Sequence, residues 1–277
     1  MLNTTAEKSN AAHYEKSWEQ IERMCAICRE AGRFQMQHFR SHPPGSGDEK
    51  TDKEYVSWID VESERIVQEG LYAICPDAGF YGEETGQSGN RDVYWIVDPL
   101  DGTSNYLSGT DFFSISIALI VDGIPELGVI HKPTTGDFFT AIRGQGARHN
   151  DCAVVPPKPL DIARALIGTG FPYRSPDLIE TFFGCVKDVL RHSRGIRRFG
   201  SAALDLAYVA AGYLQGFWES ELQPYDIAAA LVILAETGCA CENERGEPYD
   251  MFHDRIFVTA IPGVFDRLSK IVQQHYR

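Results

Sequence analysis

Residues 93–105 read Val93-Tyr94-Trp95-Ile96-Val97-Asp98-Pro99-Leu100-Asp101-Gly102-Thr103-Ser104-Asn105. The apolar half is typical of a buried strand, yet it ends in two carboxylates three residues apart, followed by glycine and threonine. Two acids held close together repel each other, and a bound cation is the simplest way to offset that repulsion. Pro99 stiffens the turn, Gly102 lets a ligand approach the backbone, and Thr103 adds a hydroxyl. The stretch therefore predicts a divalent metal beside a phosphate, and with them metal-assisted phosphoryl chemistry.

The composition is that of an ordinary globular protein. Of the 277 residues, 43% are hydrophobic and 23% are charged. The chain has 26 Lys and Arg against 39 Asp and Glu, so its net charge is −13. This balance argues against bulk binding to nucleic acid or to an anionic membrane. The sequence also lacks a long apolar run and the apolar segment of a signal peptide, and it has only seven cysteines. We therefore expect a reduced, cytoplasmic protein with no membrane partner.

Hydrophobic periodicity predicts a mixture of helices and strands. Helices are expected at about 14–39, 60–74, 176–191, 202–212, 226–238 and 263–275. Strands are expected at about 80–84, 112–121, 126–131, 138–142, 165–169, 214–219 and 256–260, with a hairpin turn at Asp122-Gly123. Residues 1–12 are expected to form a flexible tail. The prolines at 156–159 are a candidate boundary between a metal-binding half, 13–155, and a substrate-side half, 156–277; one layered unit over 1–277 fits equally well.

Acidic residues recur where predicted strands end or helices begin. Glu83 and Glu84 follow a strand, Asp98 and Asp101 end the next one, and Asp226 begins a helix. Such positions let side chains from distant segments converge. Mg²⁺ prefers oxygen ligands, so four carboxylates and one backbone carbonyl could hold two or three ions.

Each acid also has a simpler explanation. The two aspartates of the 93–105 stretch could stabilise a turn, and the glutamates could be a solvated strand end. Asp226 and Asp60 could cap helices, and Glu219 could be a surface acid. Capping and metal ligation are compatible.

Two cysteine pairs and one basic pair leave alternatives open. Cys25 and Cys28, like Cys239 and Cys241, could bind zinc, but their spacing and apolar context favour buried thiols. The adjacent Arg197 and Arg198 could neighbour a substrate, although a surface salt bridge is favoured.

Six segments together resemble the inositol monophosphatase family of magnesium-dependent, lithium-sensitive phosphomonoesterases. In chain order they are Val56-Ser-Trp-Ile-Asp60, Gly82-Glu-Glu-Thr85, residues 95–106, Gly195-Ile-Arg-Arg-Phe-Gly-Ser-Ala-Ala203, Trp218-Glu219 and Tyr225-Asp226. The Asp-Pro-Leu-Asp-Gly-Thr element is highly specific for this family. The other segments are weak evidence alone and are convincing only because they occur together in the family's order. The chain departs from the family at Tyr225, where a tryptophan is usual, and at Glu236-Thr-Gly-Cys239, where Glu-Ala-Gly-Gly is usual.

The resemblance implies a role for each matched residue. Glu83, Asp98 and the Leu100 carbonyl resemble ligands of one metal, and Asp98, Asp101 and Asp226 resemble ligands of a second; Glu83 also resembles a ligand of a third. Catalytic roles are implied for Glu83, Thr103 and Asp60, the last two forming a pair that helps to activate the attacking water. Phosphate or substrate contacts are implied for Asp101, Gly102, Thr103, Gly200, Ser201, Ala202, Glu219 and Asp226.

The resemblance also implies a fold and an activity. The fold would be an α/β sandwich with αβαβα layers, of the sugar-phosphatase type, and the protein would be a homodimer. The reaction would be Mg²⁺-dependent hydrolysis of a small polyol phosphomonoester, with myo-inositol monophosphate the first choice. Fructose 1,6-bisphosphate, histidinol phosphate and 3′-phosphoadenosine phosphates are alternative substrates. A different class of function is a regulatory binding partner of the transcription machinery, because some bacterial relatives act in that way.

Overall fold

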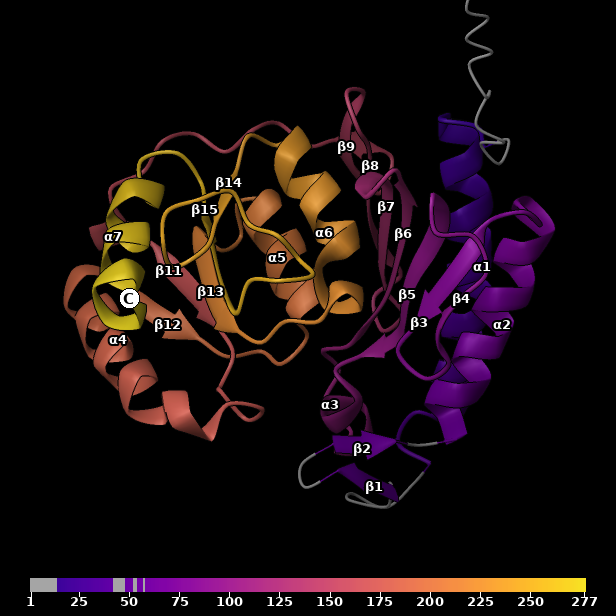
Figure 1. Ribbon diagram of the computed structural model, residues 1–277, viewed down its shortest axis with the longest axis horizontal. Helices are drawn as coiled ribbons and strands as arrows, with labels where there is room; N and C mark the ends of the chain where they lie inside the picture. The colour runs from indigo at the N-terminus through magenta and orange to yellow at the C-terminus, as the bar shows by residue number, and fades with distance from the viewer. Residues whose placement is uncertain (1–13, 42–47, 52–53, 57) are drawn as a thin grey trace, which may run out of the picture.

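Two β-sheets and three layers of helices alternate across the molecule (Figure 1). The computed structural model describes residues 14–41, 48–51, 54–56 and 58–277, so the predicted tail at 1–12 lies outside the described residues. The helices are α1 (Trp18–His38), α2 (Trp58–Ile74), α3 (Thr103–Leu107), α4 (Ile179–His192), α5 (Ala202–Ala210), α6 (Pro224–Glu236) and α7 (Phe265–Tyr276).

The larger sheet has eight strands in the order β10-β9-β8-β7-β6-β5-β3-β4. Their bounds are β3 (Gly79–Gly82), β4 (Gly86–Ser88), β5 (Val93–Asp101), β6 (Ser114–Val121), β7 (Ile124–Lys132), β8 (Asp137–Ile142), β9 (Gly146–His149) and β10 (Cys152–Ala153). Most neighbours are antiparallel, and β3 pairs with β5 in parallel. The hairpin predicted at Asp122-Gly123 joins β6 to β7; both turn residues have positive φ, which suits aspartate and glycine.

The smaller sheet has five strands in the order β12-β11-β13-β15-β14. Their bounds are β11 (Leu166–Thr169), β12 (Gly195–Arg197), β13 (Gly216–Ser220), β14 (Ala240–Glu242) and β15 (Ile256–Ala260). A separate two-stranded ribbon, β1 (Asp48–Thr51) with β2 (Glu54–Val56), lies near α3 in Figure 1.

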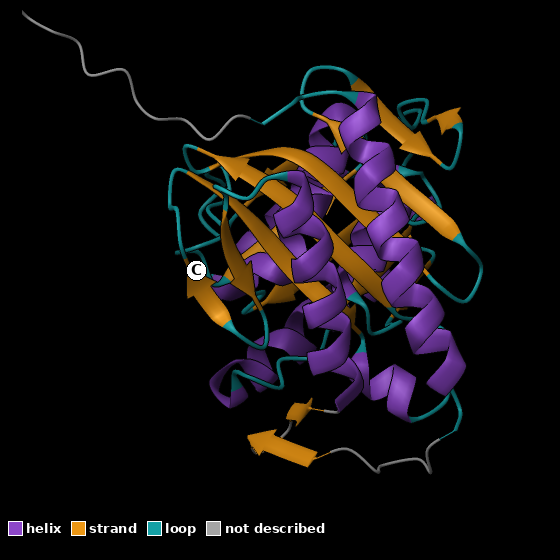
Figure 2. Cartoon of the chain, turned by 90° about the vertical axis from the view of Figure 1, so that its right-hand side faces the viewer, coloured by secondary structure: helices purple, strands orange, loops and turns teal. Residues whose placement is uncertain are grey.

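The helices form the three α-layers. Helices α1 and α2 lie side by side across the outer face of the large sheet, as Figure 2 shows, while α5 and α6 fill the space between the sheets. Helices α4 and α7 cover the outer face of the small sheet. The predicted αβαβα sandwich is therefore confirmed.

Side chains along β5 alternate between two cores. Val93, Trp95 and Val97 pack with α1 and α2, whereas Tyr94 and Ile96 belong to the core that includes α5 and α6. All nine residues of the strand are buried. By this alternation, the side chain of the next residue, Asp98, faces the middle helical layer.

Several short elements were not predicted, and some boundaries differ from those expected. Strands β4, β9, β10, β12 and β14 and the helix α3 have two to five residues each, too few for hydrophobic periodicity to reveal. The helix expected at 176–191 begins with a 3₁₀ turn, Pro176–Leu178, and becomes α-helical only at Ile179. Proline at the start of that turn is compatible with helical φ.

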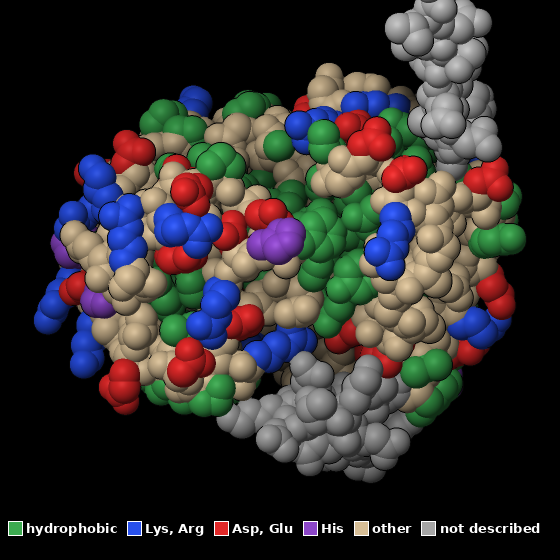
Figure 3. All heavy atoms as spheres, viewed as in Figure 1, with side chains coloured by type: hydrophobic (Ala, Val, Ile, Leu, Met, Phe, Trp, Pro, Cys, Tyr) green, Lys and Arg blue, Asp and Glu red, His purple; other side chains and the backbone are tan. Residues whose placement is uncertain are grey.

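The surface in Figure 3 carries both signs of charge, and hydrophobic side chains gather near the middle of this face. Lysines and arginines are most frequent at the left end, where Figure 1 places α4 and α7. None of the helices that the structure describes is both long enough and apolar enough to cross a bilayer.

Candidate metal centre

A β-bulge in β5 brings Asp98 and Asp101 to the same face of the sheet. Asp98 pairs with Ser116 and Asp101 with Ser114, so three steps along β5 match two steps along β6. In a regular strand, residues three apart point to opposite faces. The extra residue reverses the alternation, and both carboxylates face the middle layer. Within the turn, the Leu100 amide donates a hydrogen bond of 3.0 Å to the Asp98 carboxylate.

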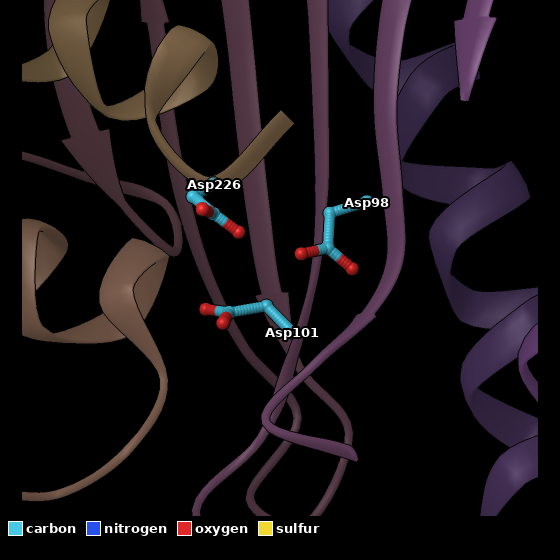
Figure 4. Close-up of side chains that lie close together, drawn as sticks. All are labelled: Asp98, Asp101 and Asp226. Carbon is cyan, nitrogen blue, oxygen red and sulfur yellow. The ribbon is translucent and has the colours of Figure 1, made fainter. Parts of the chain in front are cut away.

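Asp226 reaches the same place from the first turn of α6. Pro224 begins this helix, and the Asp226 carboxylate accepts a 2.7 Å hydrogen bond from the Gln223 amide, which completes a capping box. The N-cap of α6 is therefore Gln223 rather than Asp226, and Asp226 takes part in capping as the third residue of the helix. This role coexists with a second arrangement. One carboxylate oxygen from each of Asp98, Asp101 and Asp226 lies within 4.8 Å of the other two. Figure 4 shows these three side chains close together.

The electrostatics of this cluster are unfavourable without a cation. Burial raises the pKa of Asp98 well above its usual range, and the nearby charges of Glu83, Asp101 and Asp226 raise it further. Burial, then Asp226, raises the pKa of Asp101 to about 7, although hydrogen bonds from Ser201, Ala203 and Ala202 oppose the shift. A set of oxygen-only donors that repel one another fits a hard divalent cation such as Mg²⁺.

Glu83 lies at the edge of this cluster rather than inside it. It lines the same cavity, but it is not one of the three carboxylates that converge. Burial raises its pKa well above the usual range, followed by the charges of Asp226, Asp60 and Glu84. The Glu83 amide donates to the Val97 carbonyl at 3.2 Å, which places this residue beside β5. Glu83 is thus close enough to the cluster for the charge of Asp226 to raise its pKa.

The raised carboxyl pKa values predict that the metal-free protein becomes less stable as the pH rises. Asp101 and Glu219 have folded-state pKa values of about 7 and 8, well above those of an unfolded chain. Between about pH 5 and 7 the unfolded chain has lost these protons while the folded protein still binds them, so raising the pH lowers the free energy of unfolding. Differential scanning calorimetry without Mg²⁺ should show Tm falling across this window, and added Mg²⁺ should raise Tm more at pH 8 than at pH 7. A Tm that rises with pH would contradict this prediction.

Gly102 and Thr103 follow the bulge at the start of α3. Gly102 adopts φ of +98°, and a Cβ here would lie 3.1 Å from the carbonyl oxygens of Gly200 and Phe112, so glycine is required. The Thr103 hydroxyl lies 3.0 Å from an Asp60 carboxylate oxygen and 3.0 Å from the Leu100 carbonyl. Asp60 is 1% exposed. It therefore serves as a hydrogen-bond acceptor for Thr103 in the interior.

The second half of the chain contributes the opposite wall through α5. The Asp101 carboxylate accepts hydrogen bonds from the Ser201 hydroxyl at 2.5 Å and from the amides of Ala202 and Ala203 at 3.2 and 2.8 Å. Ser201 is also the N-cap of α5. Asp101 thus joins the large sheet to the first turn of α5, and this contact brings residues 200–202 to the cavity.

The cavity has a volume of about 1260 Å³. It is lined by Glu83, Asp98, Leu100, Asp101, Gly102, Thr103, Gly200, Ser201, Ala202, Glu219 and Asp226, among others. Of the site residues predicted from sequence, Asp60 alone is not on this lining; it lies behind Thr103. Glu219 lines the cavity, so the surface-acid alternative is wrong for this residue.

The cavity wall also contains residues that sequence reasoning did not single out, among them the charged side chains of Arg174 and Asp205. Arg174, in the loop after β11, places a guanidinium nitrogen 3.6 Å from the Asp226 carboxylate. Asp205 on α5 is 2% exposed, and its pKa is raised well above the usual range by burial and then by Glu219. A buried aspartate in an apolar helix was the available signal for Asp205.

The structure also tests the alternatives for Arg198 and for the two cysteine pairs. Arg198 lines the cavity with its guanidinium 5.7 and 5.5 Å from the ring centroids of Phe171 and Tyr173, so the favoured surface salt bridge was wrong for this residue. All seven cysteines are free. Within the described ranges, the group of side chains that could hold a metal is the three-aspartate cluster, which disfavours zinc at either cysteine pair.

Comparison with known proteins identifies relatives both by sequence and by fold. Residues 17–276 match the model of the inositol monophosphatase family. A Pasteurella multocida protein named Nus factor SuhB is 38% identical over 203 residues, which cover 72% of this chain and 76% of that protein.

Two solved structures have the same fold over nearly the whole chain. The extragenic suppressor protein suhB from Bartonella henselae has a TM-score of 0.85 and 34% identity, covering 92% of this chain and 98% of that one. An inositol monophosphatase from Anabaena has a TM-score of 0.83 and 28% identity, covering 93% and 96%. The chain described here belongs to the inositol monophosphatase family.

Proposed function

We propose that this chain is a Mg²⁺-dependent phosphomonoesterase that hydrolyses a small polyol phosphate, with myo-inositol monophosphate the first choice of substrate. One observation carries the proposal: three aspartates from β5 and α6 converge at a cavity where the Thr103 hydroxyl and Asp60 are already paired. Membership of the family, and the name of the Anabaena neighbour, support a phosphatase.

The proposed ligands are those that the resemblance implied. Glu83, Asp98 and the Leu100 carbonyl would hold one Mg²⁺, and Asp98, Asp101 and Asp226 a second, with Glu83 available to a third. When bound, Mg²⁺ supplies Lewis-acid polarisation of phosphoryl oxygens and a lower pKa for a coordinated water. The residues present fit that role, because they are oxygen donors whose mutual repulsion a cation relieves.

The chain's own groups would orient the reactants. In this proposal the Thr103 hydroxyl and the Glu83 carboxylate position the attacking water. As the oxygen–phosphorus bond forms, the Thr103 hydroxyl takes the proton of the water and passes its own proton to the Asp60 carboxylate. Backbone amides of Gly102 and Thr103 would bind the phosphoryl oxygens, where charge accumulates in the transition state. The phosphorus–oxygen bond to the polyol then breaks, and the polyol oxygen takes up a proton.

The substrate side of the cavity would be formed by Gly200, Ser201, Ala202 and Glu219. Glu219 could accept a hydrogen bond from a polyol hydroxyl. The Ser104-Asn105 pair resembles inositol-type members of the family more than nucleotide-type ones. A cavity of about 1260 Å³ nevertheless leaves space for larger phosphomonoesters, so specificity depends on a few polar contacts.

A substrate panel tests the activity. We expect phosphate release from myo-inositol monophosphate to require Mg²⁺, to be inhibited by Li⁺, and to exceed release from fructose 1,6-bisphosphate, histidinol phosphate and 3′-phosphoadenosine phosphate in kcat/KM. Colorimetric phosphate detection gives these values. Equal activity on all four substrates would replace the inositol assignment with a promiscuous phosphatase, and activity without Mg²⁺ would reject the metal mechanism.

A second candidate function follows from the names of the relatives. The Pasteurella multocida relative is named a Nus factor, which favours a regulatory partner in the transcription machinery. The two functions can share one protein, and a cytoplasmic homodimer would suit both. Capture of RNA polymerase or its elongation factors from a bacterial lysate by the wild-type chain, but not by a matched unrelated acidic protein, would support this candidate.

A further inference from the structure

Helix α2 carries buried polar side chains on the face that it turns toward the large sheet. Asp60, Ser63 and Glu64 fall within one helical turn, and each is at most 1% exposed. The core-facing stripe of such a helix is normally apolar, because a buried polar group is costly unless it is hydrogen-bonded. All three are hydrogen-bonded: Asp60 and Glu64 contact segments of the candidate metal centre directly, and Ser63 does so through a side chain of α1.

Two of the contacts reach the end of β5 and the residues that follow it. The Asp60 carboxylate accepts the Thr103 hydroxyl at 3.0 Å. The Ser63 hydroxyl accepts the Gln35 side-chain amide at 3.1 Å, and the same amide nitrogen donates to the Pro99 carbonyl at 2.7 Å. Through Gln35 of α1, α2 therefore holds the bulge that separates Asp98 from Asp101.

The third contact fixes the segment that carries Glu83. The two Glu64 carboxylate oxygens accept the amides of Glu84 and Thr85, each at 2.9 Å. Gly82 makes this approach possible, since a Cβ there would lie 2.3 Å from a Glu64 oxygen. On its other side the Glu83 amide bonds the Val97 carbonyl at 3.2 Å. Glu83 is therefore held between α2 and β5.

We propose that Glu64 is a positioning residue of the metal centre: by binding the two amides after Glu83, it orients the Glu83 carboxylate toward the aspartate cluster and thereby sets the affinity for Mg²⁺. The inference rests on the proposed function only in taking Glu83 as a metal ligand. Glu64 does not line the cavity, so its effect passes through Glu83.

The test is Glu64→Gln, with Mg²⁺ binding measured by isothermal titration calorimetry. Two amide donors need two acceptor oxygens; glutamine keeps one and turns an NH₂ group toward the other donor. We expect the Mg²⁺ dissociation constant to rise by about 10- to 100-fold, the range seen when groups that orient metal ligands are removed. At saturating Mg²⁺, kcat should stay within a few-fold of wild type.

Glu69→Gln is the matched control. Glu69 lies on the same helix, its side chain is exposed, and its carboxylate pairs with Arg65 rather than with the site. Its Mg²⁺ affinity should equal that of wild type. If Glu64→Gln lowers Tm but leaves the Mg²⁺ dissociation constant unchanged, Glu64 is merely structural and the inference is overturned.

Two further measurements keep the outcomes distinct. If circular dichroism shows that Glu64→Gln does not fold, Glu64→Asp keeps both acceptor oxygens on a shorter side chain and should weaken Mg²⁺ binding to a smaller extent. Unchanged binding in that variant overturns the inference. Phosphate release by the wild-type chain tests the proposed function separately. If the wild-type chain binds Mg²⁺ but hydrolyses no phosphomonoester, the proposed enzymatic activity is rejected, while the positioning role of Glu64 still stands.

Discussion

Asp98→Asn is expected to lower Mg²⁺-dependent phosphate release about a thousandfold. Asp98 is 2% exposed and belongs to the three-carboxylate cluster, and in the proposed mechanism it is shared by two metals. Bound metal stabilises transition-state charge by several kcal/mol, and about 4 kcal/mol corresponds to that factor in rate. The measurement is kcat/KM over a range of Mg²⁺ concentrations, together with calorimetric Mg²⁺ binding.

The same variant separates loss of the metal site from loss of the fold. Asparagine keeps an oxygen that can accept the Leu100 amide, and it removes a negative charge that the neighbouring acids repel. Without Mg²⁺ its Tm should therefore be higher than that of wild type. Asp122→Asn is the control at the far end of the β6–β7 hairpin, because Asp122 is exposed and asparagine tolerates its positive φ. Near-normal activity of Asp98→Asn would reject the ligand role.

Thr103→Val is the second change with a large expected effect, about 100- to 10,000-fold in kcat, the usual contribution of a positioned proton-transfer group. Valine replaces the hydroxyl with a methyl group of similar size, so the bond to Asp60 is lost while the packing of α3 is kept. Because Thr103 is not one of the proposed ligands through its side chain, calorimetric Mg²⁺ affinity should change little. Steady-state kinetics at saturating Mg²⁺ measures the effect.

Thr103→Ser is the matched rescue variant. Serine retains a hydroxyl at the same position and should recover most of the activity that valine loses. If Thr103→Val and Thr103→Ser reduce kcat equally, the threonine methyl group is important for activity and the hydroxyl is not. That result would reject a role for Thr103 in proton transfer. If valine weakens Mg²⁺ binding as strongly as it lowers kcat, Thr103 acts by shaping the turn.

The long, strongly periodic elements were predictable because their signals are local. Helix α1, the β6–β7 hairpin and β15 follow from apolar spacing and from one Asp-Gly turn. The β-bulge was not predictable: the sequence suggested a strand that ends in Asp98 and Asp101, but not the shift of register between them. Pairing with β6 determines that shift, and pairing is a long-range property.

The polar face of α2 is a second feature that the sequence did not predict. Ser63 and Glu64 gave no sequence signal, because a serine and a glutamate on a helix are usually solvated. Their burial and their partners depend on how α2 packs against α1 and β5. Arg174 was missed for the same reason. Asp205 did give a signal, as an aspartate in an apolar helix, but helix α5 meets the cavity only when both sheets are assembled.

By itself, the sequence determined the chemical character of the site: oxygen donors at the ends of strands and the start of a helix, a glycine where the backbone must turn, and a hydroxyl beside it. These depend on residue identity and short-range spacing. Tertiary structure decided which donors meet. Asp98 and Asp101 share a face because of a bulge, Asp226 joins them because α6 packs on the large sheet, and Asp101 bonds α5 of the other half. Such convergence depends on strand register and helix packing, which arise from contacts between residues far apart in the chain.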